Sequence, residues 1–180
     1  GQVSADALAA VALGNMYFMT TGMLGMGVLF ALDPIVSQAV GAKDDRGVAR
    51  GVQRGLVLAV VMCLPLFVPL AFSRAVFEAL RQPAEVVPIA SSYVDLSIPG
   101  LFPFFAFIVL RQSLQAMGKL TPIVIAIVFA NLLNLLLCWI FVFGNLGAPA
   151  LGAVGSAIAS TIGRWAMAGF LLAVAWRDLK

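Results

Sequence analysis

The stretch TPIVIAIVFANLLNLLLCWIFVF, residues 121–143, carries no charged side chain over 23 positions. A helix that crosses the hydrocarbon core of a bilayer needs roughly 20 mostly apolar residues, so this stretch predicts a membrane-spanning helix. Four further stretches are long and mostly apolar, at residues 8–40, 48–72, 86–110 and 151–176, with approximate bounds. The sequence therefore predicts an all-α fold, a polytopic transmembrane helix bundle with five spans.

The overall composition supports a bilayer environment. The chain is 62% hydrophobic and 11% charged, with a mean hydropathy of +1.05. In soluble domains, about a quarter of all residues are charged. Histidine is absent, and Cys63 and Cys138 lie inside apolar runs, where we interpret them as lipid- or core-facing thiols. We expect no metal site, no cofactor and no nucleic-acid partner. An enzyme is disfavoured because no nucleophile has a base nearby.

Two segments depart from simple spans. Residues 8–40 are too long for a perpendicular span, and Asp33–Pro34 interrupts them, so this stretch is tilted, kinked at the proline or extended beyond the bilayer. Residues 74–82 are too polar to span, but their apolar residues recur at helical spacing. We predict a short interfacial helix there, on the outer surface, which stops at Pro83.

The distribution of basic residues predicts an orientation. One group follows the first and third spans and ends the chain: Lys43, Arg46, Arg50, Arg54, Arg111, Lys119, Arg177 and Lys180. Basic residues favour the cytoplasmic side, so five spans place the N-terminus outside and the C-terminus inside, with the chain in the plasma membrane. An external, barely charged N-terminus without a signal peptide is difficult to insert. We therefore expect one missing span upstream, which would complete a bundle of six.

Polar side chains in the fourth span need an explanation. Asn131 and Asn134 project about 60° apart around a helix, and Cys138 lies another 40° or so beyond Asn134. Two interpretations are open. The amides hydrogen-bond a neighbouring helix, or they form the polar wall of a cavity that binds a cation, a carboxylate or a substrate. Spacing alone favours the first.

Three charged residues in or near the spans have the same ambiguity. A carboxylate at membrane depth is costly and usually faces protein or water, but Asp33 and Asp95 also fit positions near an interface. Arg164, deep in the last span, either snorkels to the surface or lines a cytoplasmic vestibule. The small-residue stripe Gly155, Ala159 and Gly163 predicts tight helix packing.

Three motifs resemble one family, in order along almost the whole chain. They are LDPIVSQAVGA (32–42), SYVDLSIPGLFPFFAFIVLRQSLQAMGKLTPIVIA (92–126) and NLLNLLLCWIFVFGNLGAPALGAVGSAIAST (131–161). Together they resemble elements of the multidrug and toxic compound extrusion (MATE) transporters. The resemblance implies two six-helix lobes related by pseudo-symmetry. This chain would supply spans two to six of the first lobe, and the missing first span and the C-terminal lobe would be its partners.

The resemblance also implies a function. MATE transporters export drugs and organic cations by alternating access, driven by inward Na⁺ or H⁺ flow. The expected partners are the lipid bilayer and small cationic or amphipathic substrates. Two alternatives are a lipid-linked oligosaccharide flippase of the same superfamily and a membrane scaffold that does not transport.

The family's cation site implies candidate residues here. It combines an Asp on the first span, which lies outside this chain, with polar residues on the fifth and sixth spans. The fifth-span pattern is Asn followed four residues later by Asp or Asn. Asn134 matches the Asn, Cys138 departs from the second position, and Thr161 matches the sixth-span Thr. Asn131, one turn before Asn134, is a weaker companion.

Overall fold

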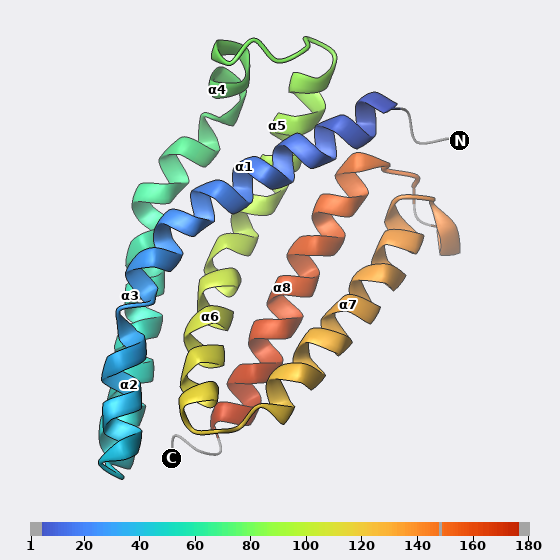
Figure 1. The fold of residues 1–180 in the computed structure, drawn as a ribbon. Helices are drawn as coiled ribbons and strands as arrows, with labels where there is room; N and C mark the ends of the chain where they lie inside the picture. Colours follow the sequence, from blue (N-terminus) through green and yellow to red (C-terminus); the bar gives the residue numbers. More distant parts are fainter. Residues whose placement is uncertain (1–4, 148, 177–180) are drawn as a thin grey trace.

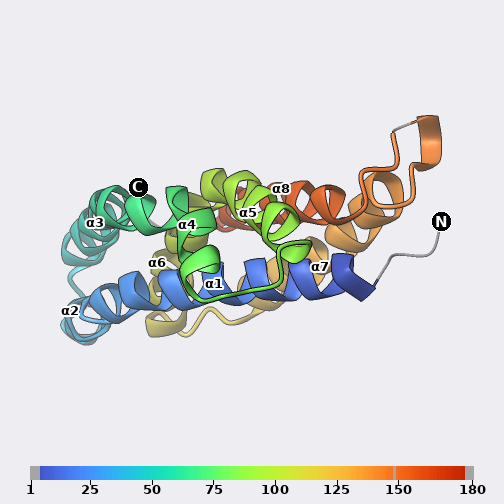
Figure 2. The ribbon, with the colours of Figure 1, turned by 90° about the horizontal axis from the view of Figure 1, so that it is seen from above.

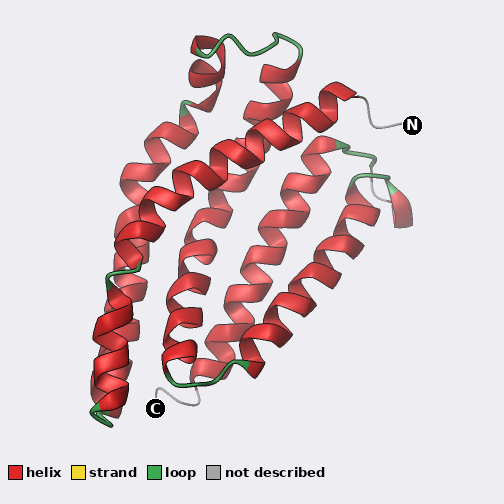
Figure 3. Cartoon of the chain, viewed as in Figure 1, coloured by secondary structure: helices red, strands yellow, loops and turns green. Residues whose placement is uncertain are grey.

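The structure, a computed structural model, describes residues 5–147 and 149–176. Every regular element within these ranges is helical (Figure 3). Five helical stretches are long and apolar enough to cross a membrane: α1 (Ala5–Leu29), α3 (Asp45–Ala71), α5 to α6 (Val86–Ala116), α7 (Thr121–Phe141) and α8 (Ala153–Trp176). The predicted all-α bundle with five spans is confirmed. The tail residues Arg177 and Lys180, which entered the orientation argument, lie outside the described residues.

The first long stretch, 8–40, is not one continuous helix. It divides into α1 and a separate helix, α2 (Leu32–Gly41), with a turn at residues 30–31. Proline has no N–H, and its ring clashes with the carbonyl four residues earlier, so Pro34 cannot continue a helix through Phe30. The Asp33 N–H instead donates to the Phe30 carbonyl at 3.1 Å. The break therefore corresponds to the proline kink among the three alternatives.

The third span contains a second proline break. Here α5 (Val86–Ser97) is joined to α6 (Leu101–Ala116) by one 3-10 turn, η1 (Ile98–Gly100), which contains Pro99. The helix then continues beyond its expected end at residue 110. It stops where Gly118 adopts φ = 72°, a left-handed conformation that glycine accommodates without a Cβ clash.

The short helix expected at 74–82 is present as α4 (Ser73–Ala79). Its expected stop at Pro83 is wrong, because Arg81 adopts φ = 53° and ends the helix first. The Gln82 N–H donates to the Phe77 carbonyl at 3.1 Å, and the Arg81 N–H donates to that of Glu78 at 3.0 Å. These two bonds form a Schellman motif. A location at the membrane interface stays a prediction.

Helix α1 crosses one face of the bundle. Figure 2 shows it lying along the row formed by α3, α5 and α8, and it contacts all three helices. The start of α1 and the end of α8 lie at opposite ends of the bundle (Figure 1). An odd number of spans produces this arrangement.

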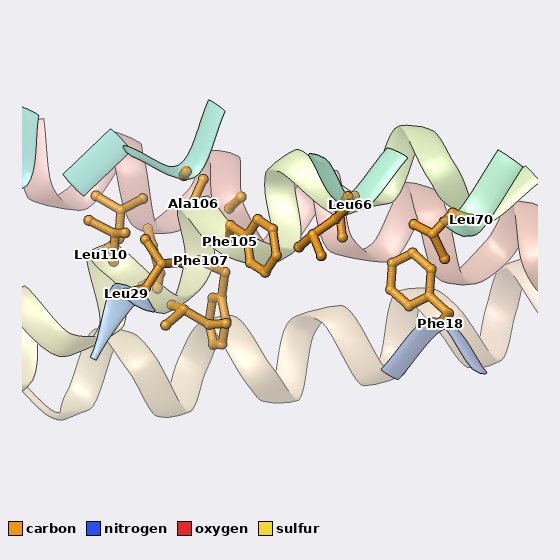
Figure 4. Packing of buried hydrophobic residues seen from close by; sticks show 14 of the residues in the cluster. Phe18, Leu29, Leu66, Leu70, Phe105, Ala106, Phe107 and Leu110 are labelled. Atoms are coloured by element: carbon orange, nitrogen blue, oxygen red, sulfur yellow. The ribbon is translucent and has the colours of Figure 1, made fainter. Parts of the chain in front are cut away.

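The core lies between α1, α3 and α6. Phe18, Leu66 and Phe105, one from each helix, are among its buried residues (Figure 4). Glycines on α1 admit aromatic rings of the third span. A Cβ on Gly14 would lie 2.8 Å from Tyr93 Cδ1, and one on Gly22 would lie 3.1 Å from Phe104 Cε1. Glycine therefore allows α1 to approach α5 and α6 closely.

Helices α7 and α8 form the other side of the bundle. Gly155, Ala159 and Gly163 are all buried, and a Cβ on Gly155 would meet the backbone carbonyl of Phe141. Near the other end of the stripe, a Cβ on Gly163 would lie 3.9 Å from Asn134 Cβ. The stripe thus faces α7, which agrees with the packing interpretation.

Candidate functional site

Asn134 lies in the interface between α7 and α8. Its Nδ2 is 3.5 Å from Ser160 Oγ on α8, and the Cys138 thiol donates to Asn134 Oδ1 across 3.8 Å. Both bonds are long, and a thiol is a weak donor. All three side chains are half-buried. We call Asn134, Cys138 and Ser160 the amide cluster; the three side chains form a polar group between α7 and α8.

Asn131 does not join the amide cluster. It is exposed, and its Nδ2 donates to the Ile127 carbonyl of its own helix at 2.8 Å. Its amide nitrogen thus bonds one turn back along α7 and not to a neighbouring helix. The two asparagines are only about 60° apart around the helix. This rotation is nevertheless enough to place Asn134 against α8 and Asn131 away from it.

Thr161 faces the break in the third span. Its hydroxyl donates to the Leu96 carbonyl of α5 at 2.9 Å, and one turn later Trp165 Nε1 donates to the Pro99 carbonyl at 3.1 Å. Helix α8 therefore supplies two donors to backbone carbonyls, one near the end of α5 and one in η1. A proline break frees backbone groups, and neighbouring helices satisfy them inside a membrane.

Arg164 is buried beside the same break. It is 8% exposed, and its guanidinium carbon lies 4.1 Å from the centre of the Phe18 ring, close enough for a cation–π contact. Gly100 makes room for it, since a Cβ there would lie 3.1 Å from Arg164 Nη1. That nitrogen has no hydrogen-bond partner among the described residues. This position fits an internal residue and not a snorkelling one.

The two intramembrane carboxylate candidates lie apart from these residues. Asp33 is exposed in the first turn of α2, where it lines a cavity with Arg111 and Gln112 of α6. Asp95 is exposed on α5, on the side of that helix away from its buried residues. The structure thus gathers Asn134 with Cys138, and Thr161 with Arg164, but it leaves Asn131, Asp33 and Asp95 separate.

Several residues around the site did not emerge from sequence reasoning. Gly100, Trp165 and Phe18 build the surroundings of Arg164, and Gln112 is buried in α6. One available signal was the tripeptide Ile98-Pro99-Gly100 within an apolar run, because a proline there frees carbonyls that need donors from another helix. Gln112 offered no such signal, since its burial depends on the neighbouring helices.

Comparison with known proteins identifies the family. The MatE family model matches residues 1–140. A "Probable multidrug resistance protein NorM" from Synechocystis is 32% identical over 93% of this chain and 36% of its own length. A protein of the same name from Mesorhizobium japonicum is 32% identical over all of this chain and 39% of its own. This chain therefore spans well under half the length of these relatives.

Solved structures share the fold. One described as "Inward-facing conformation of a multidrug resistance MATE family transporter of the MOP superfamily" matches with a TM-score of 0.80 and 24% identity, over 95% of this chain and 38% of that one. Another, "Crystal structure of MATE in complex with MaD3S", has a TM-score of 0.78 and 25% identity, over 98% of this chain and 38% of that one. The family model and the NorM relatives agree with the fold, and the chain belongs to the MATE family.

Proposed function

We propose that this chain is part of a secondary active transporter that exports drugs and organic cations in exchange for inward Na⁺ or H⁺. The observation that carries the proposal is the match, over nearly the whole chain, to relatives named as multidrug resistance proteins. The protein would work in the plasma membrane by alternating access. Its N-terminal side would face outward and its C-terminal side the cytoplasm. A preceding span and an opposing lobe would complete the transport path.

The amide cluster is our candidate for the ion-coupling region. Amide and hydroxyl oxygens are ligands for hard cations, and the Asn134 amide contacts Ser160 Oγ through its Nδ2 and Cys138 through its Oδ1 in one interface. Cys138 contributes a soft sulfur, which suits hard cations poorly, and its thiol already donates to Asn134. We therefore assign ion binding to Asn134 with a carboxylate from the preceding span, and we give Cys138 a positioning role.

The break in the third span is our candidate for the moving part. The Thr161 and Trp165 hydrogen bonds join α8 to the carbonyls of Leu96 and Pro99. Hinges are element ends that absorb changes in φ and ψ, and η1 joins two helices in this way. A change in ion occupancy at α7 and α8 would reach the third span through these contacts.

Gradient-driven transport in proteoliposomes tests the proposal. The full-length protein would be reconstituted with a fluorescent organic cation, and either a Na⁺ gradient at equal pH or a pH gradient without Na⁺ would be imposed. We expect one of the two ion gradients to drive the substrate in the direction opposite to the ion flow. An ionophore that dissipates that gradient should abolish the movement. Movement under neither gradient, with correctly folded protein, would overturn the assignment.

The chain alone provides a matched comparison. We predict that vesicles containing only residues 1–180 show no gradient-driven uptake, because half of a two-lobe carrier lacks an opposing wall. The full-length protein, reconstituted in the same lipids, is the positive control. Drug uptake by residues 1–180 alone would contradict the two-lobe mechanism.

A further inference from the structure

A polar cavity lies away from the amide cluster, at the junction of α1 and α2. It has a volume of about 200 Å³ and lies between the kink and α6. We call it the kink cavity. Its polar lining is Asp33, Arg111, Gln112 and Gln115, and Met26 and Phe30 contribute apolar atoms.

The buried, unpaired side-chain amide of Gln112 makes the kink cavity a candidate binding site. It is 8% exposed, and within the described part of the chain neither its Nε2 nor its Oε1 has a hydrogen-bond partner. A glutamine amide offers two donors and an acceptor, and buried polar groups are normally paired. The adjacent Ser113 follows that rule by donating to the Val109 carbonyl at 2.8 Å. A polar occupant of the cavity would satisfy Gln112 in the same way.

The charges around Gln112 define the chemistry of that occupant. Asp33 and Arg111 are exposed residues that line the same cavity, yet they form no ion pair within 4.0 Å in the described structure. A carboxylate attracts an ammonium group, and a guanidinium pairs with a phosphate or carboxylate. The lining therefore complements a small molecule that carries both charges.

We propose that the kink cavity binds a zwitterionic group with a primary ammonium at Asp33 and an anionic oxygen at Arg111, with the Gln112 amide bonded between them. Two sources have this chemistry: the headgroup of an aminophospholipid and a soluble zwitterion. Phe30, which is 51% exposed at the cavity, places apolar surface beside the polar lining. This assignment does not depend on which substrates the protein moves.

Native mass spectrometry of the full-length, delipidated protein tests the proposal. The probes are phosphatidylethanolamine, phosphatidylcholine and soluble glycerophosphoethanolamine. Phosphatidylcholine is the control lipid, because its trimethylated ammonium has no N–H to donate. We expect phosphatidylethanolamine to bind preferentially, and Asp33→Asn, Arg111→Gln and Gln112→Met each to weaken that binding about tenfold. Arg50→Gln and Gln38→Met, which change residues of the same type outside the cavity, should leave binding unchanged.

The outcomes separate the two sources. Variant-sensitive binding of phosphatidylethanolamine alone supports a lipid headgroup, whereas variant-sensitive binding of glycerophosphoethanolamine as well supports a site open to soluble zwitterions. Asp33 and Arg111 are exposed, so their variants should fold, and thermal unfolding in the same detergent checks this. Binding that is equal for both lipids, or equal in wild type and all three cavity variants, would overturn the proposal.

Discussion

The third and fourth spans differ in a direction that hydropathy alone does not predict. In the most apolar 18-residue window of α7, mean hydropathy is 2.6 and 17% of residues are buried, whereas the corresponding window of Val86–Ala116 has a mean hydropathy of 1.8 and 67% of its residues buried. Of these two spans, the less apolar one is thus the more buried within the described residues. Leu132, Leu135 and Trp139 of α7 are all exposed.

This contrast follows from the solvent. Lipid tails are as apolar as leucine, so helices in a bilayer gain little by hiding leucine from their surroundings. Close approach and hydrogen bonds decide which helix lies inside. The third span has the aromatic rings that face glycines of α1, and its proline break receives two donors from α8. Packing and polar contacts therefore mark the centre of this bundle.

The largest predicted effect comes from truncating a core aromatic. Phe105→Ala removes a ring that is 0% exposed and should cost about 3–5 kcal/mol of stability. Leu135→Ala on α7, where the side chain is 69% exposed, should change stability by less than about 0.5 kcal/mol. Thermal unfolding in one detergent measures both. Equal losses would mean that burial in the described bundle does not govern stability.

A pair of glycines in α1 sharpens the comparison. A Cβ at Gly25 would collide with the Phe105 ring and would lie 2.9 Å from Leu66 Cδ1, whereas one at Gly27 would meet no atom within 4 Å. Gly25→Leu should therefore destabilise the protein by roughly 1–3 kcal/mol. Gly27→Leu should be neutral or slightly stabilising, because leucine favours a helix more than glycine does.

Yield of monodisperse protein and the midpoint of thermal unfolding distinguish the two variants. If Gly25→Leu behaves like Gly27→Leu, α1 does not pack on the third span as the structure shows.

The smallest effect concerns the proline break. Trp165→Phe removes the hydrogen bond from Nε1 to the Pro99 carbonyl and should cost about 1 kcal/mol, the usual size for such a bond between membrane helices. Trp139→Phe, at an exposed tryptophan of α7, is the matched control. Hydrogen exchange of the amides around η1 should increase in the first variant only. Equal exchange in both would remove the role given to α8 at the break.

The sequence alone predicted the number and type of the spans, because a long, mostly apolar stretch indicates a membrane-spanning helix whatever its neighbours are. It also offered a kink at Pro34 as one of three alternatives for residues 8–40, and the structure has a break there. The end of α4 was missed because no rule of composition predicts that Arg81 adopts a left-handed conformation. A nearby proline was the more obvious stop signal, and it lies two residues later.

The candidate site was predictable only in part. The periodicity of Asn131 and Asn134 placed both on one side of the helix, but only Asn134 reaches α8. Which of two neighbouring faces meets a partner depends on the crossing of α7 and α8, and that crossing follows from the Gly155 and Gly163 contacts. Arg164 needed the same tertiary information, since Gly100 and Phe18 come from other helices.

The central claim is that Asn134, and not Asn131, takes part in ion-coupled transport. Initial rates of gradient-driven efflux of a fluorescent organic cation, measured for Asn134→Ala and Asn131→Ala in the full-length protein at equal expression, test it most directly. We predict at least about a tenfold loss for Asn134→Ala, as expected when a ligand worth roughly 1.4 kcal/mol is removed, and a wild-type rate for Asn131→Ala. A wild-type rate for Asn134→Ala, or equal losses in the two variants, would contradict the account.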